Sequence, residues 1–322
     1  MGFTIPAILF IGEEPMKHSK LKLLSTLEWY LLIMVPVFGT VVFSIIPLFL
    51  TFANSLQNMA ENFVGLVNYE LLFANSEFQQ AFGNTIYMGI LGILMNIPLA
   101  FVLATMLNNV NRGKSFYKIC FLLPLIMSMV TVALLFKFIF SADPNSIANS
   151  VLRFFGAAPR GFFNDPTMSR ETVVFMAVWK GIGYNVILFF AGLQTLPREY
   201  YEAAQIDGAN EFKQWFYITI PCMRNIFIFV YITTAINVLR RFTDVFTVGG
   251  EPGAPAGSMF TIMMFIYRNS FSTRWSRDLG AGSAASVVLF FLIITITMIN
   301  VYLTEGDGVK NFLSRFRIKR SN

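Results

Sequence analysis

The stretch YYEAAQIDGANEFKQWFYITIP, Tyr200–Pro221, stands out from the long apolar runs on either side of it. It carries four charged side chains within a dozen residues, an alanine pair and an Asp-Gly step. An Asp-Gly step suits a helix end, because glycine tolerates the left-handed conformation of a C-terminal cap. Pro197 suits a helix start, and Asn210 can cap a second helix. The pattern predicts two short helices joined by a sharp turn, an elbow over residues 197–221.

The composition around this elbow is that of a membrane protein. The chain has 322 residues, of which 55% are hydrophobic and only 13% are charged, whereas roughly 25% are charged in an ordinary soluble domain. A water-soluble protein of this size could not bury so much apolar surface. We therefore expect an all-α integral membrane protein.

Six runs are apolar enough, and long enough at about 20 residues of helix, to cross a bilayer. The fifth run contains Arg240 and Arg241. A helix cut at Leu239 would keep 15 residues, or about 22 Å, which is too short to cross about 30 Å of hydrocarbon. We therefore extend the predicted helix through both arginines. The six predicted transmembrane helices are Trp29–Phe52, Thr85–Leu107, Phe116–Phe140, Thr172–Leu196, Asn225–Val248 and Ala284–Leu303.

The distribution of basic residues predicts the orientation. Fourteen Lys and Arg residues lie on the side of the two termini and eight in the loops on the other side; the positive-inside rule then places both termini in the cytoplasm. The elbow faces the cytoplasm as well. The predicted organisation is a cytoplasmic or interfacial segment (1–28), a transmembrane domain (29–303) and a basic cytoplasmic tail (304–322). The net charge of +6 reflects this topology, so we expect no nucleic-acid partner.

From the residues alone, the elbow could equally be an interfacial loop that returns the chain to the bilayer. Its spacing resembles the EAA motif of permeases of binding-protein-dependent ABC importers, with Ile220 in place of the usual leucine. In that motif the ATPase-coupling residues would be Glu202, Ala203, Ala204, Asp207, Gly208, Ile218 and Pro221.

Other stretches resemble the maltose-type, carbohydrate-uptake branch of this family. They are GLVNYELLFANSEFQQAFGNT (Gly65–Thr85), FLLPLIMS (Phe121–Ser128), AGLQTLPREYYEAAQIDGA (Ala191–Ala209) and FTVGGEPG (Phe246–Gly253). The resemblance implies a type I importer permease fold in the bacterial inner membrane, with the elbow as a coupling-helix pair. The loop Gly249–Ser258 resembles the segment that touches a solute-binding protein, although it could also be a plain connector.

The resemblance also implies partners. These are a second permease subunit, expected to be a paralogue, two ABC ATPase subunits, an extracytoplasmic solute-binding protein, a saccharide substrate and the membrane lipids. ATP and Mg would be bound by the ATPases, and we expect neither a cofactor nor an enzymatic site in this chain. NNVNRGKS (Asn108–Ser115) ends like a phosphate-binding loop but lacks its first glycine, and the single histidine, His18, cannot build a His-based metal site.

The substrate site is predicted from two clusters. Ionisable groups at membrane depth are costly and mark function, and in the resembling permeases an aromatic-glycine run and a polar stretch in the next span bind the sugar. These positions correspond here to Trp179, Lys180, Gly181 and Tyr184, and to Asn237, Arg240 and Arg241.

The basic residues in these clusters predict an acidic saccharide. Arginine binds carboxylates bidentately, which suits a uronate oligomer such as an alginate or pectin fragment. A neutral oligosaccharide or a sugar phosphate remains the alternative, in which the arginines pair with headgroups or Asp244 and Lys180 extends to the membrane surface.

A secondary transporter that works without ATP is a more distant alternative. Such a protein typically carries an internal repeat and acidic groups that relay protons or sodium within its spans. The predicted spans contain no Asp or Glu before Asp244, which disfavours this class.

Overall fold

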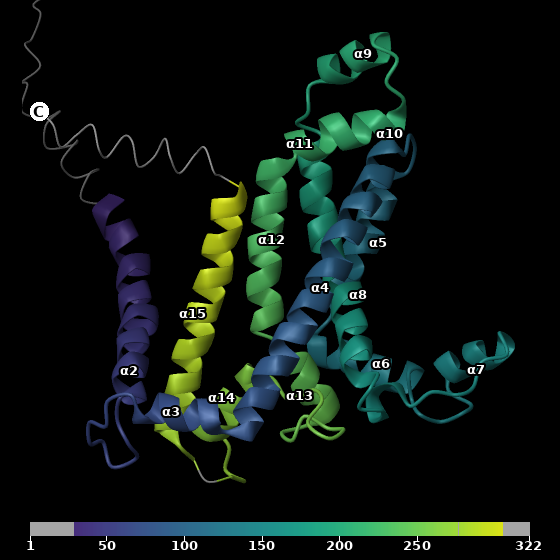
Figure 1. Cartoon of the computed structure of the whole chain (residues 1–322). Helices are drawn as coiled ribbons and strands as arrows, with labels where there is room; N and C mark the ends of the chain where they lie inside the picture. The colour runs from purple at the N-terminus through teal and green to yellow at the C-terminus, as the bar shows by residue number, and fades with distance from the viewer. Residues whose placement is uncertain (1–28, 276, 305–322) are drawn as a thin grey trace, which may run out of the picture. The chain divides into compact units, whose positions relative to one another are not determined.

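The computed structural model describes residues 29–275 and 277–304, and their regular structure is helical apart from one isolated β-bridge between Gln57 and Phe63 (Figure 1). The chain divides into two units, residues 1–53 and 54–322. The described residues of the first unit, 29–53, belong to a helix of 27 residues, Trp29–Ser55, that is long and apolar enough to span a membrane. It contains a π-helical turn, η1 (Val41–Ile45), and ends as α2 (Ile46–Ser55).

The second unit contains the remaining candidate spans and two sets of shorter helices. The spans are α4 (Ser76–Asn109), the pair α5 (Lys114–Ile126) and α6 (Met129–Ile139), α8 (Ser169–Leu193), α12 (Arg224–Leu239) with α13 (Thr243–Gly249), and α15 (Leu279–Thr304). At one end, the elbow end, lie α9 (Arg198–Ile206), α10 (Glu211–Gln214), η3 (Trp215–Thr219) and α11 (Ile220–Cys222). At the opposite end lie α3 (Val67–Ala74), α7 (Ile147–Phe154), η2 (Phe162–Asn164) and α14 (Ile262–Ser270). Among the described residues, five helices and one bent pair therefore qualify as spans, which confirms the six-span fold class.

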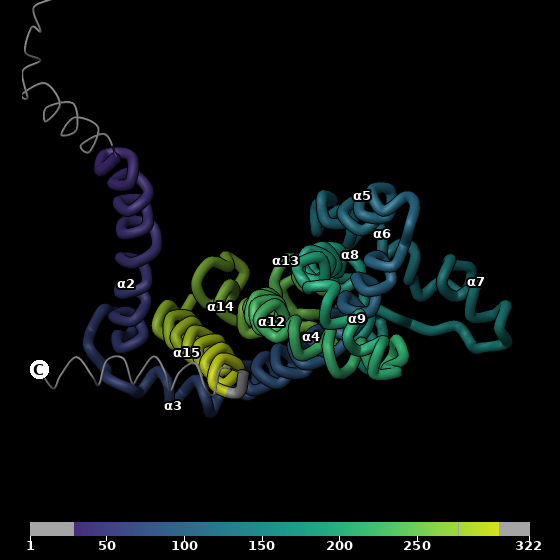
Figure 2. Tube along the Cα trace, turned by 90° about the horizontal axis from the view of Figure 1, so that it is seen from above, coloured from purple at the N-terminus to yellow at the C-terminus, as the bar shows by residue number. Residues whose placement is uncertain are grey.

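The centre of this unit is a helix pair. Helix α4 packs along α8, and α12 and α5 pack against the same pair, as the view from above shows (Figure 2). Met88 and Ala100 of α4 and Val186 and Phe189 of α8 are fully buried. The spans therefore pack through apolar side chains, and the polar groups described below are exceptions within this core.

The third span is not the continuous helix Phe116–Phe140 that the sequence predicts. Helices α5 and α6 meet at a bend of 96°, and the backbone of Met127 and Ser128 between them is extended. Pro124 lies inside α5, where proline removes a hydrogen bond and clashes with the preceding turn. The prediction of one continuous helix was wrong: the bend follows the end of α5 at Ile126, and hydropathy does not signal it because the residues around it are almost all apolar.

The fifth span is also interrupted. Helix α12 ends at Leu239 and α13 begins at Thr243, although Arg224–Gly249 as a whole is long and apolar enough to cross a membrane. Extending the span through the arginines is thus confirmed, and the continuity of its helix is wrong. The break leaves backbone groups without helical hydrogen-bond partners inside the bundle. Such groups are tolerated at membrane depth where they are buried in protein or line a cavity.

Candidate functional site

The elbow has the predicted two-helix shape. Helix α9 begins directly after Pro197 and runs to Ile206, and the chain then turns at Gly208, whose φ is +74°. The side chain of Asn210 accepts a hydrogen bond from the Lys213 backbone N–H, at 2.9 Å, and so caps α10. The second arm differs in detail, because α10 continues as the π-helical turn η3 before α11.

The elbow is held together by its own polar side chains. The hydroxyl groups of Tyr201 on α9 and Thr219 on η3 lie 2.9 Å apart in a hydrogen bond. Gln214 is buried, and its side chain donates to the Ala209 carbonyl at 2.9 Å. The two arms are therefore fixed relative to each other.

Most of the motif residues lie on the elbow surface. Glu202, Ala203, Asp207, Gly208 and Pro221 are exposed, whereas Ala204 and Ile218 are half-buried. Large apolar side chains are exposed beside them, with 88% of Ile206 and 69% of Phe212 accessible. A short polar element that leaves so much apolar side chain uncovered is typical of a docking surface.

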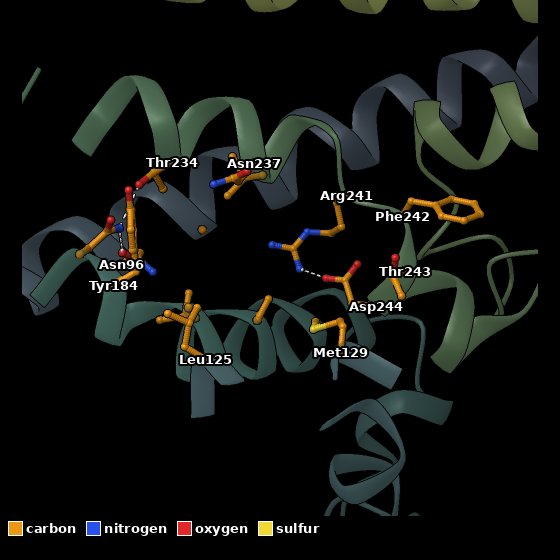
Figure 3. A pocket seen from close by; sticks show the side chains of 16 residues that line it. Asn96, Leu125, Met129, Tyr184, Thr234, Asn237, Arg241, Phe242, Thr243 and Asp244 are labelled. Atoms are coloured by element: carbon orange, nitrogen blue, oxygen red, sulfur yellow. Dashed lines mark hydrogen bonds and ion pairs between the residues drawn. The ribbon is translucent and has the colours of Figure 1, made fainter. Parts of the chain in front are cut away.

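A cavity of about 520 Å³ lies between α4, α8, α12 and the bend of α5 and α6 (Figure 3). Its volume falls in the range of roughly 300–1,000 Å³ typical of small-molecule sites. Apolar groups such as Leu125 and Met129 form part of the wall, and the polar part consists of amides, hydroxyls and one ion pair. Polar side chains from separate helices thus converge inside an apolar bundle.

The ion pair joins Arg241 and Asp244 across the break between α12 and α13. Arg241 Nη1 donates to Asp244 Oδ2 at 2.6 Å, and both side chains are buried. Asp244 Oδ1 also accepts the Val245 backbone N–H at 2.9 Å, and Thr261 donates its hydroxyl to the Arg241 carbonyl at 3.0 Å. The pair carries no net charge, so it presents a dipole to the cavity.

An amide network forms the other polar part of the wall. The Asn185 side-chain amide donates to Asn96 Oδ1 at 2.6 Å and to the Thr234 hydroxyl at 3.0 Å. The three residues come from α8, α4 and α12 and are all buried. The sequence prediction missed them, although their signal was available: a buried amide inside an apolar span is costly unless it finds partners, which makes each Asn in a predicted span a candidate.

Four of the seven predicted substrate residues line this cavity. They are Gly181, Tyr184, Asn237 and Arg241. Tyr184 is 44% exposed, so its ring remains available to a ligand. The predicted clusters on α8 and at the end of α12 are therefore brought together in space.

The other three residues lie outside the cavity wall. Trp179 packs its ring 5.3 Å from that of Phe136 on α6, and Arg240 is exposed at the end of α12. Lys180 donates to the Leu125 carbonyl at 3.2 Å. This carbonyl lies in the last turn of α5, where the backbone oxygens lack helical partners and attract a cation. Two of the three cations behind the acidic-substrate prediction, Lys180 and Arg240, thus do not line the cavity.

The loop between α13 and α14 is fixed to α4 and α8 at the end of the bundle opposite the elbow (Figure 1). Asn84 donates to the Gly257 and Phe260 carbonyls, at 2.8 and 3.0 Å. The hydroxyls of Ser169 and Ser258 lie 2.7 Å apart. The loop is thus built onto the same helices that line the cavity.

Residues 96–305 match the family described as "Binding-protein-dependent transport system inner membrane component". Among curated relatives, the arabinooligosaccharides transport system permease protein AraP of Bacillus subtilis (strain 168) is 29% identical over 84% of this chain and 88% of its own. The lactose transport system permease protein LacF of Rhizobium radiobacter is 30% identical over 81% and 88%. The sn-glycerol-3-phosphate transport system permease protein UgpA of Escherichia coli O6:K15:H31 is 32% identical over 86% and 94%.

Solved structures share the fold. A chain of a bacterial ABC transporter involved in the import of the acidic polysaccharide alginate superposes with a TM-score of 0.76 at 21% identity, over 89% of this chain and 99% of that one. A chain of the bacterial alginate ABC transporter in complex with its alginate pentasaccharide-bound periplasmic protein gives a TM-score of 0.68 at 22% identity, over 89% and 93%.

Proposed function

Because the chain belongs to the family of binding-protein-dependent transport system inner membrane components, we propose that it is a permease subunit through which an ABC importer moves an oligosaccharide inward. The observation that carries this proposal is the polar cavity within the bundle. Amides and hydroxyls from α4, α8 and α12 line it and suit the hydroxyl groups of a sugar, and the Tyr184 ring offers an apolar face on which a sugar ring can stack.

Within this class, a neutral oligosaccharide suits the cavity better than an acidic one. Arg241 is the cation in the wall, and Asp244 already neutralises it. An anionic sugar would have to compete with a buried carboxylate for the same guanidinium. The names of AraP and LacF, which refer to neutral saccharides, support the same choice.

The acidic saccharide stays as a second candidate because of the direction of the Arg241 side chain. Its guanidinium points into the cavity (Figure 3), with one edge held by Asp244. The other edge could receive a carboxylate or phosphate. UgpA, a relative with 32% identity, is named for an anionic substrate.

The elbow supports the remaining parts of the proposal. We expect its exposed surface, with Glu202 at its centre, to dock on an ABC ATPase, and the loop Gly249–Ser258 to face a solute-binding protein on the other side of the membrane. A second permease would complete the pathway. ATP and Mg would act in the ATPase subunits, whose motion opens the cavity alternately to the two sides, with both termini of this chain in the cytoplasm.

Uptake by the complete transporter, reconstituted in vesicles with its ATPases and binding protein, tests the substrate class. Neutral oligosaccharides and uronate oligosaccharides of equal length compete for uptake. We expect wild type to take the neutral set, and Asp244→Asn, which leaves Arg241 unpaired, to shift the preference toward uronates by about tenfold or more, since a hydrogen bond to a charged group contributes about 1.5–3 kcal/mol.

The control is the double variant Arg241→Gln/Asp244→Asn, which removes both charges and should keep the neutral preference. Wild-type uptake restricted to uronates would overturn the neutral assignment and favour the second candidate. Uptake by the chain without any ATPase would refute the importer itself.

A further inference from the structure

Trp215 lies where the second arm of the elbow returns to the bundle. It is the first residue of the π-helical turn η3. Its neighbours Phe212 and Phe216 are exposed, whereas Trp215 is half-buried. Single π-helical turns occur preferentially at functional sites, and here the turn directs one aromatic side chain inward.

Two contacts fix Trp215 to α4. The indole ring stacks on Phe101, with ring centroids 5.2 Å apart and planes inclined by 27°. The indole N–H donates to the Thr105 hydroxyl at 3.2 Å, and this hydroxyl donates in turn to the Phe101 carbonyl at 2.9 Å. A stack and a directional hydrogen bond together hold both the position and the orientation of the ring.

Phe101 extends this attachment to two further helices. Its buried ring meets Phe189 of α8 at 5.3 Å and Phe227 of α12 at 4.7 Å, and these two rings are 4.8 Å apart. Trp215 therefore rests on an aromatic cluster to which α4, α8 and α12 each contribute one ring. The same three helices supply the amide network of the cavity.

The cluster and the amide network are neighbouring layers of the bundle. Asn96 precedes Phe101 by five residues and Asn185 precedes Phe189 by four, which corresponds to about 6–8 Å along a helix. Thr234 follows Phe227 by seven residues, or about 10 Å. A displacement of the aromatic layer therefore reaches the cavity wall through rigid helices.

We infer that Trp215 is a positioning residue that couples the elbow to the cavity, through its stack on Phe101. The inference rests on the proposed function, in which the elbow receives the motion of an ATPase. Packed cores rearrange between discrete arrangements and do not deform continuously, so a ring locked into the aromatic cluster transmits an elbow movement to all three helices. The hydrogen bond between Tyr201 and Thr219 cannot do so, because it joins two parts of the elbow.

The test is the number of saccharide molecules transported per ATP hydrolysed by the complete reconstituted transporter. Trp215→Leu keeps an apolar side chain but loses the stack and the hydrogen bond. We expect this ratio to fall about fivefold or more, the scale of a typical coupling between sites, while basal ATP hydrolysis continues. Trp215→Phe keeps an aromatic ring on Phe101 and should restore most of the ratio.

Phe101→Leu removes the stack from the other side and should lower the ratio as well. Because both substitutions break the same stack between Trp215 and Phe101, the double variant should lower the ratio by less than the sum of the two single effects. Effects that simply add would place the two residues on separate routes and overturn the inference.

Phe265→Leu is the matched control, since it shortens a fully buried ring in the aromatic packing of Phe78 and Phe260 at the opposite end of the bundle. It should lower the thermal stability without changing the ratio. An unchanged ratio in Trp215→Leu, or in Phe101→Leu should the first variant fail to assemble, overturns the inference alone. Wild-type complex that transports no saccharide refutes the proposed function instead.

Discussion

At the scale of single residues, Gly183 sets how closely α5 approaches α8. A β-carbon at this position would lie 1.8 Å from the Phe121 carbonyl oxygen, which is far inside any permitted contact. Phe121 lies one turn before Leu125, whose carbonyl receives Lys180. The glycine and the lysine together hold the bent third span against α8, and this contact shapes one wall of the cavity.

Gly183→Ala should therefore force α5 away from α8. We expect the free energy of unfolding to fall by about 1–3 kcal/mol or more, the usual cost of overpacking. The loss should be seen as a lower midpoint of thermal unfolding in detergent. The matched control is Gly181→Ala, two residues away on the same helix, where a β-carbon would meet nothing within 4 Å. Equal midpoints for the two variants would contradict the close approach.

At the scale of elements, the segment around α7 folds about one buried side chain. The Asn149 amide donates to the carbonyls of Ser141, Asp143 and Arg160, at 3.2, 3.0 and 3.1 Å. Its oxygen accepts the Arg160 backbone N–H at 2.8 Å. One asparagine thus joins the two ends of residues 141–160, which form most of the connection between α6 and α8.

Asn149→Ala leaves these backbone groups without their partner. Since each unsatisfied group costs about 1–3 kcal/mol, we expect local opening, and with it the rate of protease cleavage within residues 141–160, to rise about tenfold or more. Asn145→Ala, an exposed asparagine in the same segment, should leave the rate near that of wild type. Cleavage that does not respond to Asn149→Ala would show that other contacts order the segment.

At the scale of the whole molecule, the elbow and the cavity belong to the same set of helices. Helix α8 leads from the cavity wall to the elbow, and α12 leads back from the elbow to the cavity. The part of the chain expected to meet an ATPase is therefore continuous with the part expected to meet the substrate. This arrangement is what an importer requires, because its energy source and its cargo act at different sites.

Assembly with the ATPase can be tested without transport. Glu202→Lys reverses an exposed charge on α9, and we expect it to reduce the amount of ATPase subunit that co-purifies with the chain at least severalfold. Glu70→Lys makes the same change on α3 at the opposite end, also at an exposed position, and should not affect co-purification. Loss of the ATPase from both variants would point to a general defect instead of a contact at the elbow.

The sequence by itself determined the elements whose causes are local. The elbow follows from Pro197, the Asp-Gly step and the Asn210 cap, each of which acts within a few residues, and the spans follow from the length of apolar runs. Hydropathy failed where a helix breaks inside an apolar run: the third span bends between Ile126 and Met129, and the fifth helix stops at Leu239.

Only the tertiary structure decided what each polar group inside the bundle does. Lys180 and Arg241 read alike in the sequence, as cations at membrane depth, yet one binds the Leu125 carbonyl at 3.2 Å and the other is neutralised by Asp244 at 2.6 Å. The amides of Asn96 and Asn185 meet across two helices that are far apart in the chain. The position of a charged residue within an apolar run indicates its depth in the membrane, but its partner depends on which helix packs beside it. The packing is set by long-range contacts, such as the close approach of α5 to α8 at Gly183.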